Sequence, residues 1–348
     1  MGYIWKYRVM LLLLVLLALL ATSCTSGAIN QGTTTSTPTP SSSGKPPTPG
    51  GSVTQIVPPR TGSSMAYDAQ TKQIVLFGGG ALNDTWTWDG QSWTQLFPAS
   101  SPTVRNGASM VYDAATGQII LFGGIGVTGT ALSDTWAWDG ANWTPLSPAI
   151  SPPARAQASM VYDAQHKQVV LFGGMVMGQQ HASSVANDTW IWDGKNWQLE
   201  HPSVAPPARA QAGMAYDASH QQTLLFGGTD GKNVLNDTWA WNGTNWQQRH
   251  PATSPVARVD ASMVYDDSAR QTVLFAGTGT ADLSDVWIWN GSNWEQRTTS
   301  PSPTGAYTAA AYCASGQNIV VYVVQVQNKA ISASQTWLWN GTKWSVSQ

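Results

Sequence analysis

A triplet of tryptophans with nearly constant spacing occurs six times in this chain of 348 residues. In one unit, Trp239 and Trp241 are one residue apart and Trp246 follows an Asn-Gly turn. The six triplets are Trp86, Trp88, Trp93; Trp136, Trp138, Trp143; Trp190, Trp192, Trp197; Trp239, Trp241, Trp246; Trp287, Trp289, Trp294; and Trp337, Trp339, Trp344. With Trp5 they account for all 19 tryptophans, so we interpret the indoles as repeated core residues and not as a special aromatic site.

Each repeat is about 50 residues long and contains four short strand signals. In the unit that begins at Arg209, the first strand is rich in small residues and ends at Tyr216-Asp217, and the second is an apolar run that ends at Gly227-Gly228. In the third, Trp239 and Trp241 share one face, because side chains alternate along a strand. The Asn-Gly that follows predicts a hairpin into the fourth strand.

A single four-stranded unit cannot bury its own aromatic face, so the units must pack sheet against sheet. Closing them radially into a ring covers every sheet face and leaves only short strand edges. The sequence therefore predicts an all-β fold, a six-bladed β-propeller with four antiparallel strands per blade, over residues 53–348. The repeats are expected at about 60–104, 105–154, 155–208, 209–257, 258–303 and 304–348.

The repeats resemble those of the kelch family. The features that carry the resemblance are an arginine before the first strand, a double glycine after the second and a tryptophan about a dozen residues later. The double glycines are Gly78-Gly79, Gly123-Gly124, Gly173-Gly174 and Gly227-Gly228. The resemblance covers residues 60–348 and implies a propeller. It does not imply one function, because kelch propellers serve as adaptors, adhesins and enzymes.

The last two repeats depart from this pattern. The fifth has Phe275-Ala276-Gly277 in place of Phe-Gly-Gly, and the sixth lacks the leading arginine and has Gln335 where the other repeats have aspartate. Residues 53–57 also echo the outer strand that begins at Trp93. The closure of the ring is therefore open, because 53–57 can complete the last blade beside 344–346 or instead of it.

The first 52 residues precede the repeats and have a different composition. Residues 1–23 carry two basic residues, an apolar run and then small residues, which predicts an export signal. The end of this segment resembles a bacterial lipobox, although Ala21 stands where leucine is usual, and the resemblance implies lipidation of Cys24. Residues 24–52 are rich in Thr, Ser, Pro and Gly and predict an extended tether. We expect a protein of the bacterial cell envelope, anchored in the membrane by its lipid; simple secretion is the alternative.

Charge and cysteine content exclude other classes of protein. Only 10% of the residues are charged, the net charge is −2 and no basic patch is present, so we expect no nucleic-acid partner. A lipidated Cys24 would leave Cys313 as the remaining cysteine, and no disulfide framework can then form. Cys313 occupies the position of an aspartate in the other repeats, which favours sequence drift over a catalytic thiol.

Strands that alternate in direction sort the loops onto two faces of the ring. On one, here called the turn face, the hairpins are short and uniform. The other, here called the loop face, receives the loops after the double glycines and the Pro-rich connections between blades. These loops vary in length, and the longest, 175–187, contains Met177, Gln179 and His181. Variable loops on a rigid scaffold commonly carry recognition, so we expect ligand binding on the loop face.

Five blades begin at the loop face with an arginine: Arg60, Arg105, Arg155, Arg209 and Arg258. In some kelch adaptors arginines at similar positions bind acidic peptides, so the resemblance allows a basic collar that holds carboxylates or sulfates. The alternative is structural. Each arginine would then tie its blade to a neighbour through Asp84, Asp134, Asp188, Asp237 or Asp285. Fivefold repetition favours the structural role, because a small ligand rarely needs five identical contacts.

No catalytic motif accompanies these residues. Four of the five histidines occupy equivalent polar positions, His166 and His220 in hairpin turns and His201 and His250 in connections, and we find no metal-binding cluster and no nucleophile elbow. We therefore expect no metal and no cofactor. The sequence favours a surface-tethered, non-catalytic module that binds a carbohydrate or protein ligand, an acidic one among the options. The alternatives are a carbohydrate-active enzyme of the sialic-acid mutarotase kind, which also uses kelch propellers, and a structural scaffold of the envelope.

Overall fold

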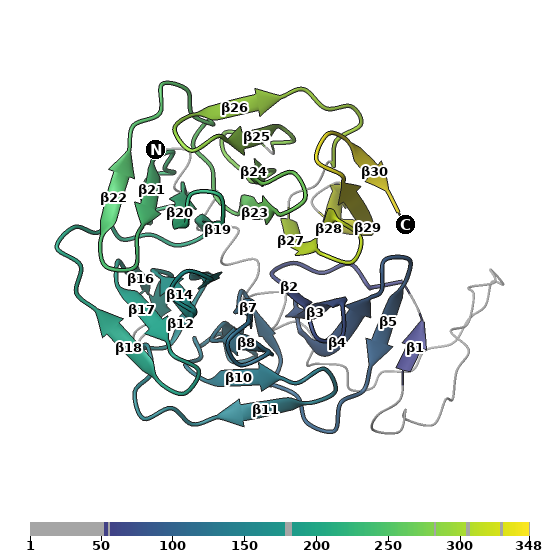
Figure 1. Ribbon diagram of the computed structural model, residues 1–348. Helices are drawn as coiled ribbons and strands as arrows, with labels where there is room; N and C mark the ends of the chain where they lie inside the picture. Colours follow the sequence, from purple (N-terminus) through teal and green to yellow (C-terminus); the bar gives the residue numbers. More distant parts are fainter. Residues whose placement is uncertain are drawn as a thin grey trace, which may run out of the picture.

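A computed structural model describes residues 52–54, 56–177, 183–281, 283–303, 307–327 and 330–347. Its strands form eight sheets, of which six are arranged around a common axis (Figure 1). Five of these six have four antiparallel strands, and the first has a fifth strand on its outer edge. The other two are small sheets of two and three strands. The predicted all-β propeller with four antiparallel strands per blade is confirmed. In the described residues, no helix is long and apolar enough to cross a membrane.

The first three blades follow the predicted repeats. Blade 1 contains β2 (Ser64–Asp68), β3 (Gln73–Gly79), β4 (Leu82–Trp88) and β5 (Trp93–Leu96). Blade 2 contains β7 (Ser109–Asp113), β8 (Gln118–Phe122), β10 (Thr135–Trp138) and β11 (Trp143–Leu146). Blade 3 contains β13 (Ser159–Asp163), β14 (Gln168–Phe172), β17 (Thr189–Trp192) and β18 (Trp197–Glu200).

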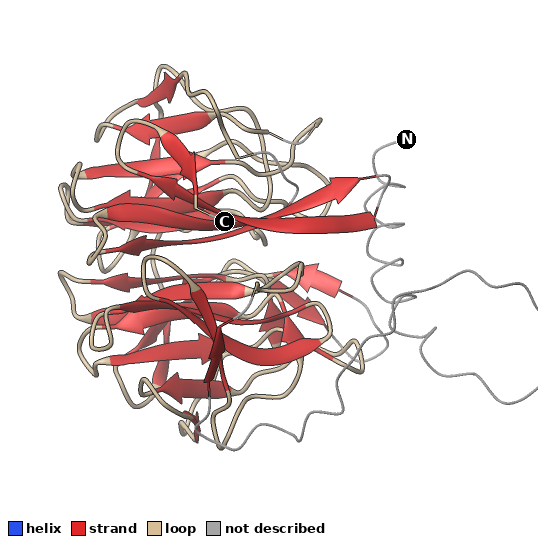
Figure 2. Cartoon of the chain, turned by 90° about the vertical axis from the view of Figure 1, so that its right-hand side faces the viewer, coloured by secondary structure: helices blue, strands red, loops and turns tan. Residues whose placement is uncertain are grey.

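The last three blades repeat this order. Blade 4 contains β19 (Gly213–Asp217), β20 (Gln222–Phe226), β21 (Thr238–Trp241) and β22 (Trp246–Arg249). Blade 5 contains β23 (Ser262–Asp266), β24 (Gln271–Phe275), β25 (Val286–Trp289) and β26 (Trp294–Arg297). Blade 6 contains β27 (Tyr307–Cys313), β28 (Asn318–Gln327), β29 (Ala330–Trp339) and β30 (Trp344–Val346). Its strands β28 and β29 are the longest and reach beyond the ring (Figure 2).

The two small sheets extend inner strands on the loop face. β6 (Arg105–Asn106) pairs with β9 (Ile125–Gly126), and β12 (Arg155–Ala156) pairs with β15 (Met175–Met177), which also pairs with β16 (Ser183–Val185). In both cases the segment that carries the arginine is joined to the loop after the double glycine of the same blade. These additions fix the arginine segments on the scaffold.

The tryptophans pack between neighbouring blades, as the repeat predicted. At the boundary of blades 1 and 2, Trp138 and Trp143 share one apolar cluster with Val75 and Phe77. The Phe77 and Trp143 rings lie 5.1 Å apart, a favourable distance for an aromatic pair. The Trp143 indole N–H also donates to Thr85 Oγ1 of blade 1 at 2.9 Å. Equivalent indole-to-threonine bonds join Trp197 to Thr135, Trp246 to Thr189, Trp294 to Thr238, and Trp93 to Thr336.

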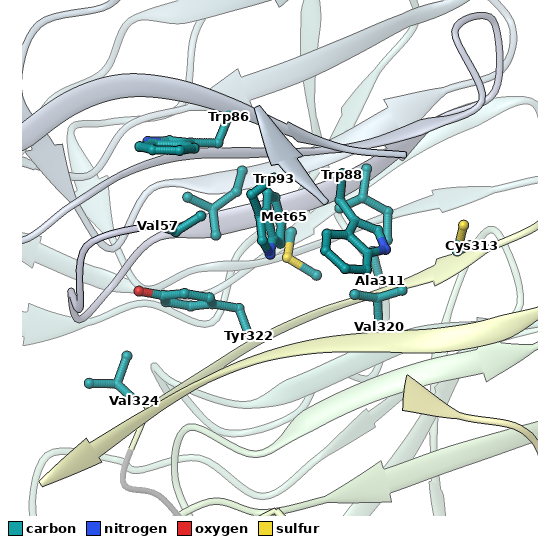
Figure 3. Packing of buried hydrophobic residues seen from close by; sticks show 12 residues of the cluster. Val57, Met65, Trp86, Trp88, Trp93, Ala311, Cys313, Val320, Tyr322 and Val324 are labelled. Carbon is teal, nitrogen blue, oxygen red and sulfur yellow. The ribbon is translucent and has the colours of Figure 1, made fainter. Parts of the chain in front are cut away.

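Ring closure uses both terminal segments, each in a different place. β30 completes blade 6, whereas β1 (Ser52–Thr54) pairs with β5 and adds a fifth strand to the outside of blade 1. The alternative in which residues 53–57 complete the last blade is therefore wrong. Val57 follows β1 and is buried between blades 1 and 6 beside Trp93 and Tyr322 (Figure 3). Tyr322 Oη donates to the Pro58 carbonyl and Ser334 Oγ to the Val57 carbonyl, both at 2.8 Å.

The double glycines follow from a close approach of the next blade. Gly173 has a φ of +65°, and a Cβ atom there would lie 2.5 Å from the Arg209 carbonyl oxygen. Gly123 meets the Arg155 carbonyl in the same way. Only glycine adopts this conformation without strain and leaves room for the neighbouring backbone. The first glycine of the pair therefore leaves room for the arginine segment of the following blade. The second, such as Gly174, leaves room for the inner segment of its own blade at Ala156 and Ala158.

Candidate functional site

The five arginine side chains of the predicted collar are buried, with 0–1% of each side chain exposed. Arg155 shows the arrangement. Its Nη1 and Nη2 donate to Asp188 Oδ1 and Oδ2 at 2.6 and 2.8 Å, Nη1 also donates to the Gly173 carbonyl, and Nε donates to the Pro153 carbonyl. The same pattern joins Arg60 to Asp84, Arg105 to Asp134, Arg209 to Asp237, and Arg258 to Asp285. These guanidinium groups therefore face their own blade and not the solvent at the mouth.

The backbone of each such arginine also contacts the preceding blade. The Arg155 N–H donates to the Leu132 carbonyl, and the Arg155 carbonyl accepts from the Gly124 N–H, so that blade 2 holds its main chain while blade 3 holds its side chain. Burial by itself would raise the pKa of the Asp188 carboxyl, but the hydrogen bonds and charge of Arg155 hold this pKa below its ordinary value. The pKa values of Asp134, Asp237 and Asp285 are lowered for the same reason.

Blade 6 has neither the arginine nor the aspartate. The Gln335 side-chain oxygen accepts from the Trp337 indole N–H at 3.2 Å, as the aspartates do from the corresponding indoles of the other blades. A neutral amide is the suitable replacement, because an aspartate without its arginine would leave a poorly compensated charge at a partly buried position.

The remaining predicted site residues are only partly described. Met177 ends β15 and is half-buried beside the arginine segment of blade 3. Gln179, His181 and Cys24 lie outside the described residues, as do the export signal 1–23 and the tether up to residue 51. Ser52, the last residue of the predicted tether, is the first residue of β1.

A narrow channel of about 200 Å³ follows the ring axis. Small residues at the entry of the inner strands line it, among them Ser63, Ala108, Ala158, Ala212 and Ala261. Their serine neighbours connect the blades. The hydroxyl groups of Ser64, Ser109 and Ser159 donate to the carbonyls of Ala108, Ala158 and Ala212 in the next blade. Small side chains are required here because the six sheets converge on the axis.

At the loop face the channel mouth is surrounded by a ladder of backbone hydrogen bonds. In blades 2 to 5 the residue two positions after the arginine donates its N–H to the carbonyl of its counterpart in the preceding blade, at 2.8 to 3.0 Å. The ladder runs through Gly62, Gly107, Gln157, Gln211 and Asp260. All five have positive φ, between +53° and +67°. This left-handed conformation is free of strain for the two glycines and strained by roughly 1–2 kcal/mol for each of the other three residues.

Gln157, Gln211 and Asp260, here called the mouth sector, are consecutive in this ladder, and each immediately precedes a residue that lines the channel. All three are half-buried, and Gln211 Nε2 donates to Asp260 Oδ2 at 2.8 Å. Burial raises the pKa of the Asp260 carboxyl to about 6, although the hydrogen bond from Gln211 acts in the opposite direction. Most other non-glycine residues with positive φ, such as Lys72 and Arg270, lie in the hairpin turns of the opposite face, where the turn type requires it. Ala276 is the exception, because it takes the place of the first glycine of the double glycine in blade 5.

The mouth sector is not recognisable as a site from the sequence. The available signal is the second residue after each leading arginine, which is glycine in blades 1 and 2 and then glutamine, glutamine and aspartate. Without the structure nothing shows that these positions share one conformation and one ring of hydrogen bonds.

The turn face holds two histidine–aspartate pairs. His166 Nδ1 lies 2.8 Å from Asp163 Oδ2, and His220 Nδ1 lies 2.8 Å from Asp217 Oδ2. Each ring lies so close to a hairpin glycine of the next blade that a Cβ atom at Gly243 or Gly291 would collide with it. The two pairs therefore join blades. In the part of the chain that the structure describes, no group of three or more His, Cys, Asp or Glu is placed to hold a metal ion.

Comparison with known proteins agrees with this architecture. Residues 141–324, more than half of the chain, match the family model described as the KLHDC2/KLHL20/DRC7 Kelch-repeats domain. No curated protein is similar enough in sequence to count as a match. Among solved structures, one titled "Structure of YjhT" superposes with a TM-score of 0.64 and covers 84% of this chain and 98% of that chain. At 14% identity this likeness shows the fold alone. The chain belongs to the kelch-repeat family of β-propellers.

Proposed function

We propose that this protein is a non-catalytic binding module whose ligand contacts the loop face at the channel mouth. The observation that carries the proposal is the mouth sector. Three successive blades keep Gln157, Gln211 and Asp260 in a strained conformation at positions where blades 1 and 2 have glycine. Strain of this kind is commonly retained where the side chains serve a function, which supports a site at these residues.

The ligand that we propose is a carbohydrate or a protein segment. Side-chain amides and a carboxylate bind hydroxyl and amide groups through paired donors and acceptors. Loops of unequal length surround the mouth, such as 125–133 in blade 2 and 229–235 in blade 4, and provide further contacts. The five arginines are not part of this proposal as ligand contacts, since each is already bonded to its own aspartate.

We also propose that the propeller is held at the outside of a bacterial membrane by lipidated Cys24 and the tether. Support comes from the sequence of the first 52 residues. The measurement is mass spectrometry of the protein extracted from membranes, which should show a diacylated Cys24 at the N-terminus. An unmodified Cys24 in the growth medium would support secretion instead.

The binding proposal is tested with glycan and peptide arrays and a variant pair. The probe is the chain without residues 1–23 and with Cys24→Ser, so that no lipid is added. The double variant Gln157→Gly and Gln211→Gly removes both amides and relieves strain. We expect its melting temperature to stay the same or rise while ligand binding is lost.

The matched control is Gln198→Ala, which removes an exposed glutamine from the outer strand β18. It should leave both melting temperature and binding unchanged. If the double variant binds as well as the unmodified protein, the ligand does not use the mouth sector. If neither array gives a ligand, the scaffold alternative is favoured.

An enzymatic role is the second candidate, because of Asp260. A carboxyl with a pKa of about 6 at the opening of a channel is suited to exchange a proton near neutral pH. The kelch resemblance implies a carbohydrate-active enzyme of the sialic-acid mutarotase kind for this candidate. NMR measurement of anomer interconversion with unmodified protein and Asp260→Asn tests it. Turnover that disappears in the variant while the sugar still binds would favour the enzyme.

A further inference from the structure

The charges around the channel mouth restrict the ligand further than the fold does. The five arginines of the loop face each form a bidentate pair with an aspartate and keep almost no exposed side-chain surface. Among the residues that the structure describes, the other lysine and arginine side chains belong to hairpin turns of the turn face, to outer strands, or to the exposed loop that contains Lys232. His201 and His250 lie at the exposed start of connections between blades, directly after the outer strands β18 and β22. In that loop, Asp230 lies near Lys232 and partly offsets its charge.

The ionisable member of the mouth sector is an acid. Asp260 receives a hydrogen bond from the neutral Gln211 amide, and no cation contributes to its electrostatic environment. At neutral pH the mouth sector thus combines a carboxylate with two amides and no paired positive charge. A ligand with its own carboxylate or sulfate at this point would meet like charge in a partly buried setting, which is unfavourable.

We infer that the mouth sector binds a saccharide that carries hydroxyl or amino groups and no acidic group. Hydroxyl and ammonium groups donate hydrogen bonds to the Asp260 carboxylate and to the amide oxygens of Gln157 and Gln211, and the amide N–H groups donate to sugar oxygens. An ammonium group adds charge attraction to Asp260. This inference rests on the proposed function, and it selects neutral and amino sugars over sialic acids, uronic acids and acidic peptides.

Isothermal titration with three oligosaccharides of equal length tests the charge preference. The probes are an oligomer of glucosamine, an oligomer of N-acetylglucosamine, and a hyaluronan oligomer that carries glucuronic acid. At pH 7 and low salt we expect the neutral and amino oligomers to bind at least tenfold more tightly than the acidic one. The Asp260→Asn variant should remove the preference for the amino oligomer over the neutral one and keep binding of the neutral oligomer.

The site is verified by the glycine double variant at Gln157 and Gln211, which should lose binding of all three oligomers. Tightest binding of the hyaluronan oligomer, lost in the same double variant, would overturn the charge assignment and leave the proposed binding site standing. Binding that survives the double variant would overturn the assignment to the mouth sector. Absence of binding to any oligosaccharide would overturn both the saccharide assignment and its charge, and a peptide found on the array would then take its place.

Discussion

Asp260 keeps a carboxylate at a position where burial opposes its charge. Its pKa of about 6 in the folded protein lies above the ordinary 3.8, so the folded state binds the proton more tightly than the unfolded state does. The stability that this group contributes is therefore highest at low pH and falls as the pH rises from about 4 to about 6. Above that range the ionised side chain lowers the free energy of unfolding by a constant amount.

The substitution Asp260→Asn removes this charge and retains an oxygen that can accept from Gln211. Because one pKa unit corresponds to about 1.4 kcal/mol, we expect the variant to be more stable by about 2–3 kcal/mol at pH 7.5 and nearly unchanged at pH 4. Urea unfolding at the two pH values measures the difference. Asp230→Asn is the control, since the pKa of Asp230 is lowered and its removal should give no gain at pH 7.5. An equal gain for D260N at both pH values would contradict the assignment.

Val286 leaves one indole of the ring without its partner. Five outer-strand tryptophans donate to a threonine of the preceding blade, but Val286 occupies this threonine position in blade 5 and the Trp344 indole N–H is buried without a hydrogen bond. We expect Val286→Thr to raise the free energy of unfolding by about 1 kcal/mol.

The control for this prediction is Val273→Thr, which places a hydroxyl at another fully buried valine of the same blade. It should lower the free energy of unfolding by about 1–3 kcal/mol, because position 273 is not equivalent to the indole-bonded threonines and the hydroxyl enters an apolar cluster. Urea unfolding measures both variants. An equal loss in the free energy of unfolding would show that the Trp344 indole N–H does not donate to the new hydroxyl of the Val286→Thr variant.

Within a blade, the arginine and aspartate act as one unit. Arg155→Ala leaves Asp188 without its partner at a partly buried position, and we expect a loss of about 3–5 kcal/mol in the free energy of unfolding. Adding Asp188→Gln reproduces the arrangement of blade 6, which has no leading arginine and in which Gln335 accepts a hydrogen bond from the Trp337 indole. The double variant should recover part of the loss in chemical denaturation. A double variant no more stable than R155A would indicate that the guanidinium, and not the orphaned carboxylate, accounts for the effect.

The strands and their order were predictable because each depends on a short pattern that recurs. Tyr-Asp ends the first strand, Gly-Gly ends the second, and alternating tryptophans mark the third, so six copies support one another. The closing segment was ambiguous, because residues 53–57 resemble an outer strand and can pair with any outer edge; in the structure Ser52–Thr54 pair with β5. The mouth sector was not predictable, because Gln157, Gln211 and Asp260 share a backbone conformation and no residue type.

The whole ring depends on contacts that run from each blade to the next. Apolar clusters fill all six blade boundaries, and the boundary of blades 6 and 1 joins segments from opposite ends of the repeat region. There Tyr322 takes the place that phenylalanine has in the other second strands, and its ring lies 6.4 Å from Trp93. Its hydroxyl holds the Pro58 carbonyl, so the segment before the first repeat seals the boundary. A substitution that weakens the packing at this boundary should therefore destabilise blades 1 and 6 before the other blades.

Val57→Asp tests this arrangement, because Val57 is 2% exposed in that boundary whereas Val256, in an inter-blade connection, is 56% exposed. A charge at position 57 is buried without a partner, and we expect a loss of several kcal/mol, about 3–5, against less than about 0.5 for Val256→Asp. Hydrogen exchange should show the fastest loss of protection in β2 to β5 and in β27 to β30, since these strands lose a neighbour when the boundary opens. Blades 3 and 4 lie across the ring and keep both of theirs. Uniform loss of protection in all six blades would mean that the ring opens only by unfolding as a whole. The segment around Val57 would then have no special role in closing the boundary of blades 6 and 1.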